Sequence, residues 1–157
     1  MDTLRAAALI AATLATGLVA GLFYSYACSV MPALRGVDDR AFVDTMRRIN
    51  VAIVNGWFLV AFLGAAVLGA LAAVLHLGRA GFGLVVAGAV LHLATVVITG
   101  TVNVPLNNAL DAAGPPSAIP DPAAVRASFE TTWVRWNTAR AVTSTAGFLC
   151  LVLALRA

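Results

Sequence analysis

The sequence FETTWVRWNTAR, residues 129–140, continues directly into an apolar segment that ends at Leu155. A membrane-spanning helix needs about 20 residues, so a helix that ends at Leu155 begins near Trp136. Asn137 and Arg140 then lie inside the membrane edge, where an unpaired amide or guanidinium is costly and usually faces protein or a water-filled cavity. We therefore expect this helix to turn a polar face towards its neighbours.

The composition of this polar face follows from helical spacing. Side chains three or four residues apart share one side of a helix. The members of this face are Trp133, Asn137, Arg140 and Ser144, with Trp136 close beside them. Such a face requires polar partners from other helices at the same depth.

The overall composition is that of an integral membrane protein. Of the 157 residues, 61% are hydrophobic and only 11% are charged, and the mean hydropathy is +0.93, which is far from the usage of a soluble domain. The uncharged runs 6–34, 49–78 and 80–110 each exceed the roughly 18 residues that indicate a spanning helix. Lipid admits only helices or closed barrels as spanning structures.

We predict an all-α fold, a four-helix transmembrane bundle with short interfacial helices in its two long loops. The bundle is one domain, 1–157, with spans at about residues 6–31, 50–77, 81–108 and 134–155. We expect the first span to be retained, because its apolar run is longer than the roughly 7–15 residues of a signal peptide. Within it, the small-xxx-small spacing of Gly17 and Gly21 favours close helix packing.

The loops carry signals for helix starts and ends. In the first loop, Asp38 or Asp39 is a suitable N-cap for a short interfacial helix. The apolar residues of that helix at helical spacing are Phe42, Met46 and Ile49. In the Pro-rich second loop, Asp121 followed by Pro122 predicts the start of the last helix. Pro105 predicts a kink or an end in the third span.

Polar side chains gather at one end of the predicted bundle. All six asparagines lie at the end that holds the long loops, as do the three tryptophans and both tyrosines. The third span contributes a polar stripe at steps of three or four residues, comprising His92, Thr95, Thr99, Asn103 and Asn107. An aromatic belt with interfacial polar groups is the simpler explanation, but a belt occupies both interfaces and asparagine does not belong to it. We therefore predict a ligand cavity between the helices.

Several classes of site and partner are not supported by the sequence. His92 lies 11 residues beyond Gly81, roughly 16 Å deep at 1.5 Å per residue, whereas His76 lies near the opposite surface. No His, Asp or Glu cluster has metal-ligand spacing, and no cofactor motif is present, so we expect no metal and no bound cofactor. Cys28 and Cys150 stand alone, which argues against thiol redox chemistry. The ten arginines are not massed on one face, so a nucleic-acid partner is not expected.

Four segments carry a resemblance to a known family. They are Phe23–Leu34, Met46–Asn50, Asn103–Asn107 and Trp133–Arg140. Together they resemble the anthrone oxygenase-like family of small four-helix integral membrane proteins, long catalogued as a domain of unknown function. The match covers nearly the whole chain, with the segments in order, and the Asn-x-Pro-x-Asn and Trp-x-x-Trp-Asn-x-x-Arg patterns are fairly specific in combination.

The resemblance implies a membrane-embedded monooxygenase reaction. Characterised fungal relatives oxidise polyketide anthrones to anthraquinones with molecular oxygen as co-substrate and without a bound cofactor. The expected partners are therefore an aromatic small molecule and the lipid bilayer. The alternative function is that of a non-catalytic ligand-binding or accessory subunit. The sequence leaves open whether the protein forms a homo-oligomer.

The residues fit this chemistry in their own right. An anthrone is a flat carbon acid, so its oxidation needs a base, donors for the developing oxyanion and flat apolar walls. The expected catalytic residues are Arg140, Asn137, Asn103 and His92. The expected substrate-binding residues are Asn107, Asn50, Trp133, Trp136, Tyr24 and Tyr26. The base stays open among His92, Glu130, Asp44 and a tyrosine.

The arginine distribution predicts the orientation in the membrane. Seven arginines lie on the long-loop side and three on the other side. The positive-inside rule therefore places the long loops and the site in the cytoplasm. A transporter is not favoured, because alternating access needs polar groups at both faces and the far end is apolar.

Overall fold

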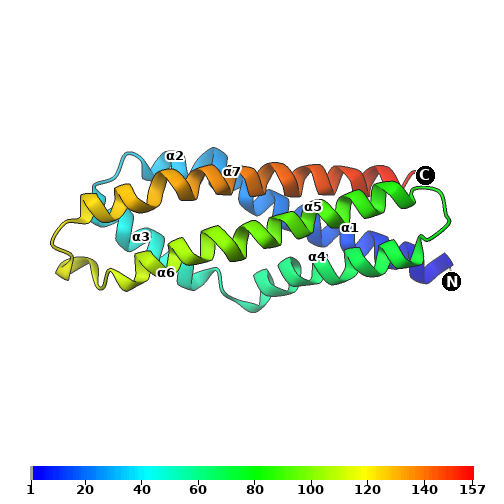
Figure 1. Ribbon diagram of the computed structural model, residues 1–157, viewed down its shortest axis with the longest axis horizontal. Coiled ribbons are helices and arrows are strands. Elements are labelled where there is room, and N and C mark those ends of the chain that lie inside the picture. The colour runs from blue at the N-terminus through cyan, green and yellow to red at the C-terminus, as the bar shows by residue number, and fades with distance from the viewer. Residues whose placement is uncertain (1) are drawn as a thin grey trace.

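The protein folds into a helical bundle (Figure 1). The computed structural model describes residues 2–157. Four long helices form it: α1 (Asp2–Ser25), α4 (Gly56–Leu75), α5 (Phe82–Ile98) and α7 (Pro122–Ala154). No strand occurs between residues 2 and 157. The predicted all-α four-helix bundle is confirmed.

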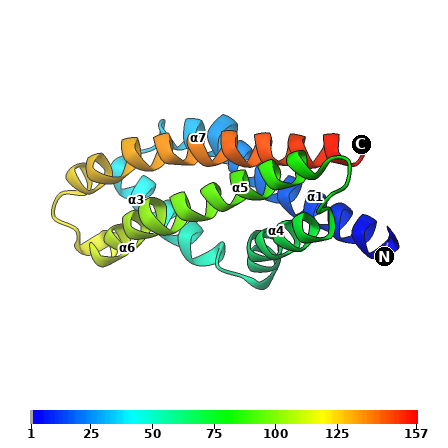
Figure 2. The same cartoon turned by 45° about the vertical axis from the view of Figure 1, so that its right-hand side comes forward.

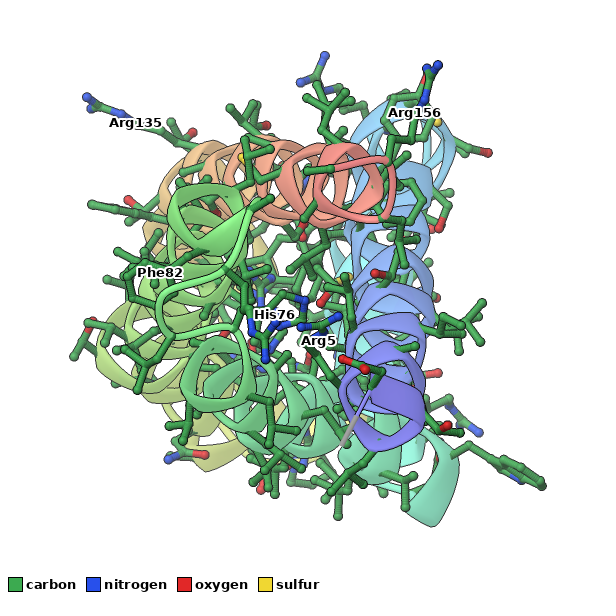
Figure 3. All side chains as sticks on the ribbon, turned by 90° about the vertical axis from the view of Figure 1, so that its right-hand side faces the viewer. Arg5, His76, Phe82, Arg135 and Arg156 are labelled. Carbon is green, nitrogen blue, oxygen red and sulfur yellow. The ribbon has the colours of Figure 1, made fainter. Side chains whose placement is uncertain are left out.

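The four helices alternate in direction and close into a square. Both chain ends and the α4–α5 turn lie at one end of the bundle, and the long connections lie at the other (Figures 1 and 2). Seen from the end that carries the termini, α7, α1, α4 and α5 occupy the four sides (Figure 3). This up-down-up-down arrangement places consecutive helices side by side and encloses a common interior.

The helices are those of a membrane protein. The stretches Asp2–Leu34, Gly56–Leu75 and Phe82–Ala112 are long and apolar enough to cross a bilayer. The 33-residue helix α7 is also long enough, but its polar residues, Asn137 and Arg140 among them, lower its mean hydropathy.

The first long loop contains the predicted interfacial helix, α3 (Asp39–Ala52). Asp38 caps it, because its carboxylate accepts a hydrogen bond from the backbone N–H of Ala41 at 3.0 Å. Phe42 and Met46 are fully buried against α6 (Val104–Ala112) and α7, so the apolar face of α3 closes the end of the bundle. In the second loop, a short 3₁₀ turn (Pro116–Ala118) precedes α7, and Asp121 caps α7 as the sequence predicts.

The junction between α3 and α4 lies later in the chain than the predicted start of the second span. Asn50 belongs to the last turns of α3, and the chain then breaks before α4. Asn55 caps α4 by accepting a hydrogen bond from the N–H of Phe58 at 3.1 Å. Asn50 therefore enters the bundle from a loop helix and not from a spanning helix.

Two prolines are accommodated without ending their helices. A π-helical turn, Tyr26–Val30, precedes α2 (Met31–Leu34), which contains Pro32. A second, Thr99–Asn103, precedes α6 (Val104–Ala112), which contains Pro105. A proline lacks its N–H and clashes with the carbonyl four residues earlier, so a widened turn at that position relieves the conflict. At Pro105 the sequence predicts an end or a kink. The structure has a π turn just before this proline, after which the helix continues as α6.

Small residues allow the helices to approach closely at particular points. A Cβ added at Gly17 lies 2.9 Å from the ring of Phe148, whereas one added at Gly21 meets no atom within 4 Å. Only Gly17 of the predicted small-xxx-small pair therefore serves packing. The closest contact joins α5 and α7, where Gly88 and Gly147 face each other across their backbones.

An arginine ties the first loop to α7. The Arg126 guanidinium donates to Glu130 at 2.6 Å and to Asp39 at 3.1 Å, and also to the carbonyls of Leu34 and Val37. The hydrogen bond that Arg126 donates to the Glu130 carboxylate holds the pKa of Arg126 above its ordinary value. This network fixes the loops that cover the end of the bundle.

Candidate functional site

A cavity lies at the long-loop end of the bundle, where the polar residues converge. Its empty volume is about 580 Å³, including the part open to the surroundings. Helices α1, α3, α4, α6 and α7 all contribute to its walls. The polar and aromatic lining residues are Phe23, Tyr26, Asn50, Phe58, Thr99, Asn103, Asn107, Trp133, Asn137 and Arg140.

Arg140 is the central charge of this cavity. Arg140 is only 5% exposed. The guanidinium donates to Oδ1 of Asn137 at 3.0 Å and to Oγ1 of Thr99 at 3.4 Å. It also lies over the ring of Phe23, with Cζ 4.3 Å from the ring centroid, so a cation–π contact supports it from the α1 side.

No carboxylate neutralises this guanidinium. In residues 2–157 the ion pairs join Arg5, Arg47, Arg48 and Arg126 to acidic partners, and Arg140 is in none of them. An isolated charge inside a protein is expensive, and buried charges are normally paired. Arg140 is thus held where it attracts an anion that the protein itself does not supply.

Three buried polar atoms of the cavity lining have no hydrogen-bond partner among the described residues: Nε of Arg140, Nδ2 of Asn50 and Oδ1 of Asn103. Buried polar groups are nearly always satisfied in folded proteins. Two donors and one acceptor are therefore available to a molecule in the cavity.

The other amides are held by the protein itself. Nδ2 of Asn137 donates to the carbonyl of Phe23 at 3.2 Å, which links α7 to α1. Oδ1 of Asn107 accepts from the indole N–H of Trp133 at 2.9 Å, which links α6 to α7. The first bond fixes the orientation of Asn137, which accepts from Arg140, and the second fixes the orientation of the Trp133 ring.

Aromatic rings form the flat part of the wall. The ring of Tyr26 lies 5.9 Å from that of Trp133, tilted by 51°. The guanidinium of Arg140 lies 5.4 Å from the centroid of the Trp133 ring. A planar molecule bounded by these rings therefore has the cation within reach of its edge.

The two π turns place polar groups in this cavity. Tyr26 begins the first π turn, whereas Thr99 and Asn103 begin and end the second. A π turn adds one residue to a helical turn and shifts the following side chains around the axis, and such turns are frequent at functional sites. Both prolines therefore contribute indirectly to the shape of the site.

Seven of the ten predicted site residues line the cavity: Arg140, Asn137, Asn103, Asn107, Asn50, Trp133 and Tyr26. His92, Trp136 and Tyr24 do not. Tyr24 is 61% exposed and Trp136 is 37% exposed, since both side chains point away from the bundle interior.

His92 is buried at a different place in the bundle. Its Nε2 lies 2.9 Å from the carbonyl of Phe62, so this nitrogen carries the proton and donates it across to α4. The Phe62 ring also meets the imidazole edge-on, with centroids 5.8 Å apart. The contact is the helix cross-link expected of a lone membrane histidine.

The two carboxylate candidates for a base are both paired with arginines outside the cavity. The carboxylate of Glu130 is bound to Arg126, and that of Asp44 accepts from Nε of Arg48 at 2.8 Å at the protein surface. Neither side chain lines the cavity. Within the described chain, no group of three or more His, Cys, Asp or Glu side chains is placed to hold a metal ion.

Sequence reasoning missed several lining residues. Thr99 was part of the predicted polar stripe but not of the predicted site, although it contacts Arg140. Phe23 and Phe58 were not predicted either. The three-residue spacing of Phe23 and Tyr26 was an available signal, because it places both on one face of the helix that runs from α1 into the first π turn.

One comparison with known proteins gives a match. The family model described as "Anthrone oxygenase" matches residues 56–150. No curated protein and no solved structure matches the chain. The matched segment includes α4, α5, α6 and most of α7, and thus Arg140, Asn137, Asn103 and Trp133 of the cavity.

Proposed function

The chain belongs to the anthrone oxygenase family, and we propose that it oxidises an anthrone-like aromatic molecule with molecular oxygen, without a bound cofactor. Family membership supports an oxygenase-type function, and the apolar helices support a membrane location for the protein. The proposed site of the reaction is the cavity around Arg140. The substrate is a flat polycyclic ketone, and the ketone oxygen at the edge of its ring system takes up the negative charge during the reaction.

The observation that carries this proposal is the unpaired guanidinium in an apolar, aromatic cavity. Arg140 is 5% exposed, lies beside the rings of Phe23 and Trp133, and has a free Nε. Such a group in a medium of low dielectric stabilises an oxyanion strongly, because its donors are already oriented and little water competes. An anthrone acquires this oxyanion when it loses a proton from its methylene carbon.

The reaction balances without a further reductant. The methylene carbon of the anthrone loses a proton, and the negative charge spreads onto the ketone oxygen beside Arg140. The electron-rich carbon then reduces dioxygen and bonds to one of its atoms, forming a peroxide. Cleavage of the O–O bond with loss of the second hydrogen leaves a new carbonyl, and the other oxygen atom leaves as water.

Proton transfer is assigned to Tyr26 in this proposal. Of the base candidates, this phenol is the one that lines the cavity. In this proposal Tyr26 reacts as the phenolate: the proton passes from the substrate carbon to the phenolate oxygen, and the negative charge moves from that oxygen to the ketone oxygen of the substrate beside Arg140. The guanidinium therefore stabilises either position of the charge.

Tyr26→Phe tests this role. The ring is retained, so we expect KM to change little, whereas kcat falls by about 10²-fold or more because general base catalysis is lost. Steady-state kinetics on purified protein, with the pH dependence of kcat, measure both effects. A Tyr26→Phe variant with near-normal kcat would remove the phenol from the reaction.

The direct test uses membranes that contain the protein and matched membranes that lack it. Anthrone loss, anthraquinone formation and oxygen uptake are followed together, and ¹⁸O₂ labels the new carbonyl if one atom of dioxygen enters the product. Retention of the anthrone with no oxygen uptake above the control would instead favour a ligand-binding subunit.

We also propose that the cavity opens on the cytoplasmic side, on the basis of the seven arginines at the long-loop end. Ser117 lies exposed in the second long loop and is a suitable reporter. In a Ser117→Cys variant, we expect a membrane-impermeant thiol reagent to label residue 117 only after the membrane is opened. Because Cys28 is itself exposed, the matched control is the chain with the native Ser117. Labelling of residue 117 in intact cells contradicts this orientation.

A further inference from the structure

A second cavity lies at the opposite end of the bundle, about the α4–α5 turn and the two termini. Its empty volume is about 770 Å³, including the part open to the surroundings. Three basic side chains line it, Arg5, His76 and Arg79, together with small and apolar residues of α1 and α7. Viewed from this end, Arg5 and His76 lie together in the middle of the square of helices (Figure 3).

The basic groups of this cavity are available to a ligand. His76 is 5% exposed, and its Nδ1 donates to the carbonyl of Ala72 at 2.7 Å, which fixes the ring and leaves Nε2 for another partner. The side chain of Arg79 makes no hydrogen bond or ion pair with any residue from 2 to 157. Arg5 is paired with Asp2 at 3.0 Å, but the Asp2 side chain is 81% exposed.

The charge at this end is not balanced by acidic side chains. Asp2 is the sole acidic residue here, because the other six acidic residues all lie in or beside the long loops at the opposite end. The end therefore has three arginines and a buried imidazole against one exposed carboxylate. An anion placed in the cavity is attracted by the basic groups that line it, Arg5, His76 and Arg79.

We propose that this cavity binds a phosphate group, and the apolar part of its wall favours the phosphate of a membrane phospholipid. Guanidinium groups bind phosphate with strong, charge-assisted hydrogen bonds. Leu9, Ala154 and Leu155 supply an apolar surface beside the basic groups, where the first carbons of acyl chains fit. The cavity lies where the spanning helices end, which is the depth of a lipid headgroup.

The test measures binding of phosphatidic acid to the full chain in neutral detergent by native mass spectrometry. Diacylglycerol is the matched ligand without phosphate, and inorganic phosphate is the competitor that represents a soluble source. Arg79→Gln and Arg5→Gln each remove one charge from the cavity. Arg156→Gln is the matched control, because Arg156 lies at the same end but points away from the bundle (Figure 3).

We expect phosphatidic acid to bind at least about tenfold more tightly than diacylglycerol, since a hydrogen bond to a charged group has this effect or a larger one. Arg79→Gln and Arg5→Gln should each weaken binding by about tenfold, and Arg156→Gln by less than twofold. Competition by millimolar inorganic phosphate would show that soluble phosphate shares the site.

Two results would overturn the proposal. One is equal binding of phosphatidic acid and diacylglycerol, and the other is an equal loss of binding in Arg156→Gln, which would indicate surface charge alone. Circular dichroism confirms that each variant is folded. Because the readout is lipid binding, the result does not depend on the oxygenase proposal.

Discussion

Replacing Arg140 with methionine is expected to reduce the oxidation of an anthrone by at least about 10²-fold in kcat, because removal of one oxyanion donor has an effect of this size. The same variant should be at least as stable as the native protein. The guanidinium is 5% exposed and has no carboxylate partner in residues 2–157, so its burial opposes folding. A purely structural arginine would show the opposite pattern, with lower stability and activity lost through unfolding.

The comparison uses kcat and the thermal midpoint, both measured on purified protein in one detergent. Arg135→Met is the matched control, because Arg135 lies on the same helix but points outward (Figure 3). Asn137→Ala, which removes the amide that holds Arg140 at 3.0 Å, should lower kcat as well. Full activity in both Arg140→Met and Asn137→Ala would exclude the proposed oxyanion site.

Gly88→Val is expected to lower stability by about 3 kcal/mol, the upper part of the usual range for overpacking. A Cβ at residue 88 lies 2.7 Å from Cγ of Leu151 and 3.1 Å from the carbonyl oxygen of Gly147. The leucine side chain can move, but the backbone of α7 yields only if α5 and α7 separate. That separation also displaces Arg140 from Thr99, so activity should fall with stability.

The control for this substitution lies on the same helix. A Cβ at Gly83 meets no atom within 4 Å, so Gly83→Val tests the effect of valine in α5 without a packing conflict. The thermal midpoints of both variants and of the native protein are compared in detergent. If Gly83→Val lowers the midpoint as much as Gly88→Val, the close approach of α5 and α7 is not the cause.

Much of the fold was predictable because its causes are local. Long uncharged runs require helices in lipid, and the caps at Asp38 and Asp121 mark where helices begin. The grouping of Asn137 with Arg140 was also predictable, because residues three apart always share a helix face. The i, i+3 hydrogen bond between them confirms that grouping.

The location of the other site residues depended on contacts between helices. Tyr24 and Tyr26 are two residues apart on the same helix, yet only Tyr26 lines the cavity. His92 lies on the predicted polar stripe, but it is bound to the carbonyl of Phe62 on the neighbouring helix. Spacing within one helix predicts that the two tyrosines face different sides, but it does not decide which of them faces inward or which group His92 binds.

The sequence by itself determined that the chain forms membrane helices and that its amides and indoles gather at one end, and it predicts a guanidinium within the bilayer edge. Only the tertiary structure decided which side of each helix faces inward, and hence which of these groups meet Arg140. The physical reason is that lipid tails are as apolar as the bundle interior. Hydrophobic periodicity therefore does not separate the two sides, and close packing, π turns and hydrogen bonds between helices do.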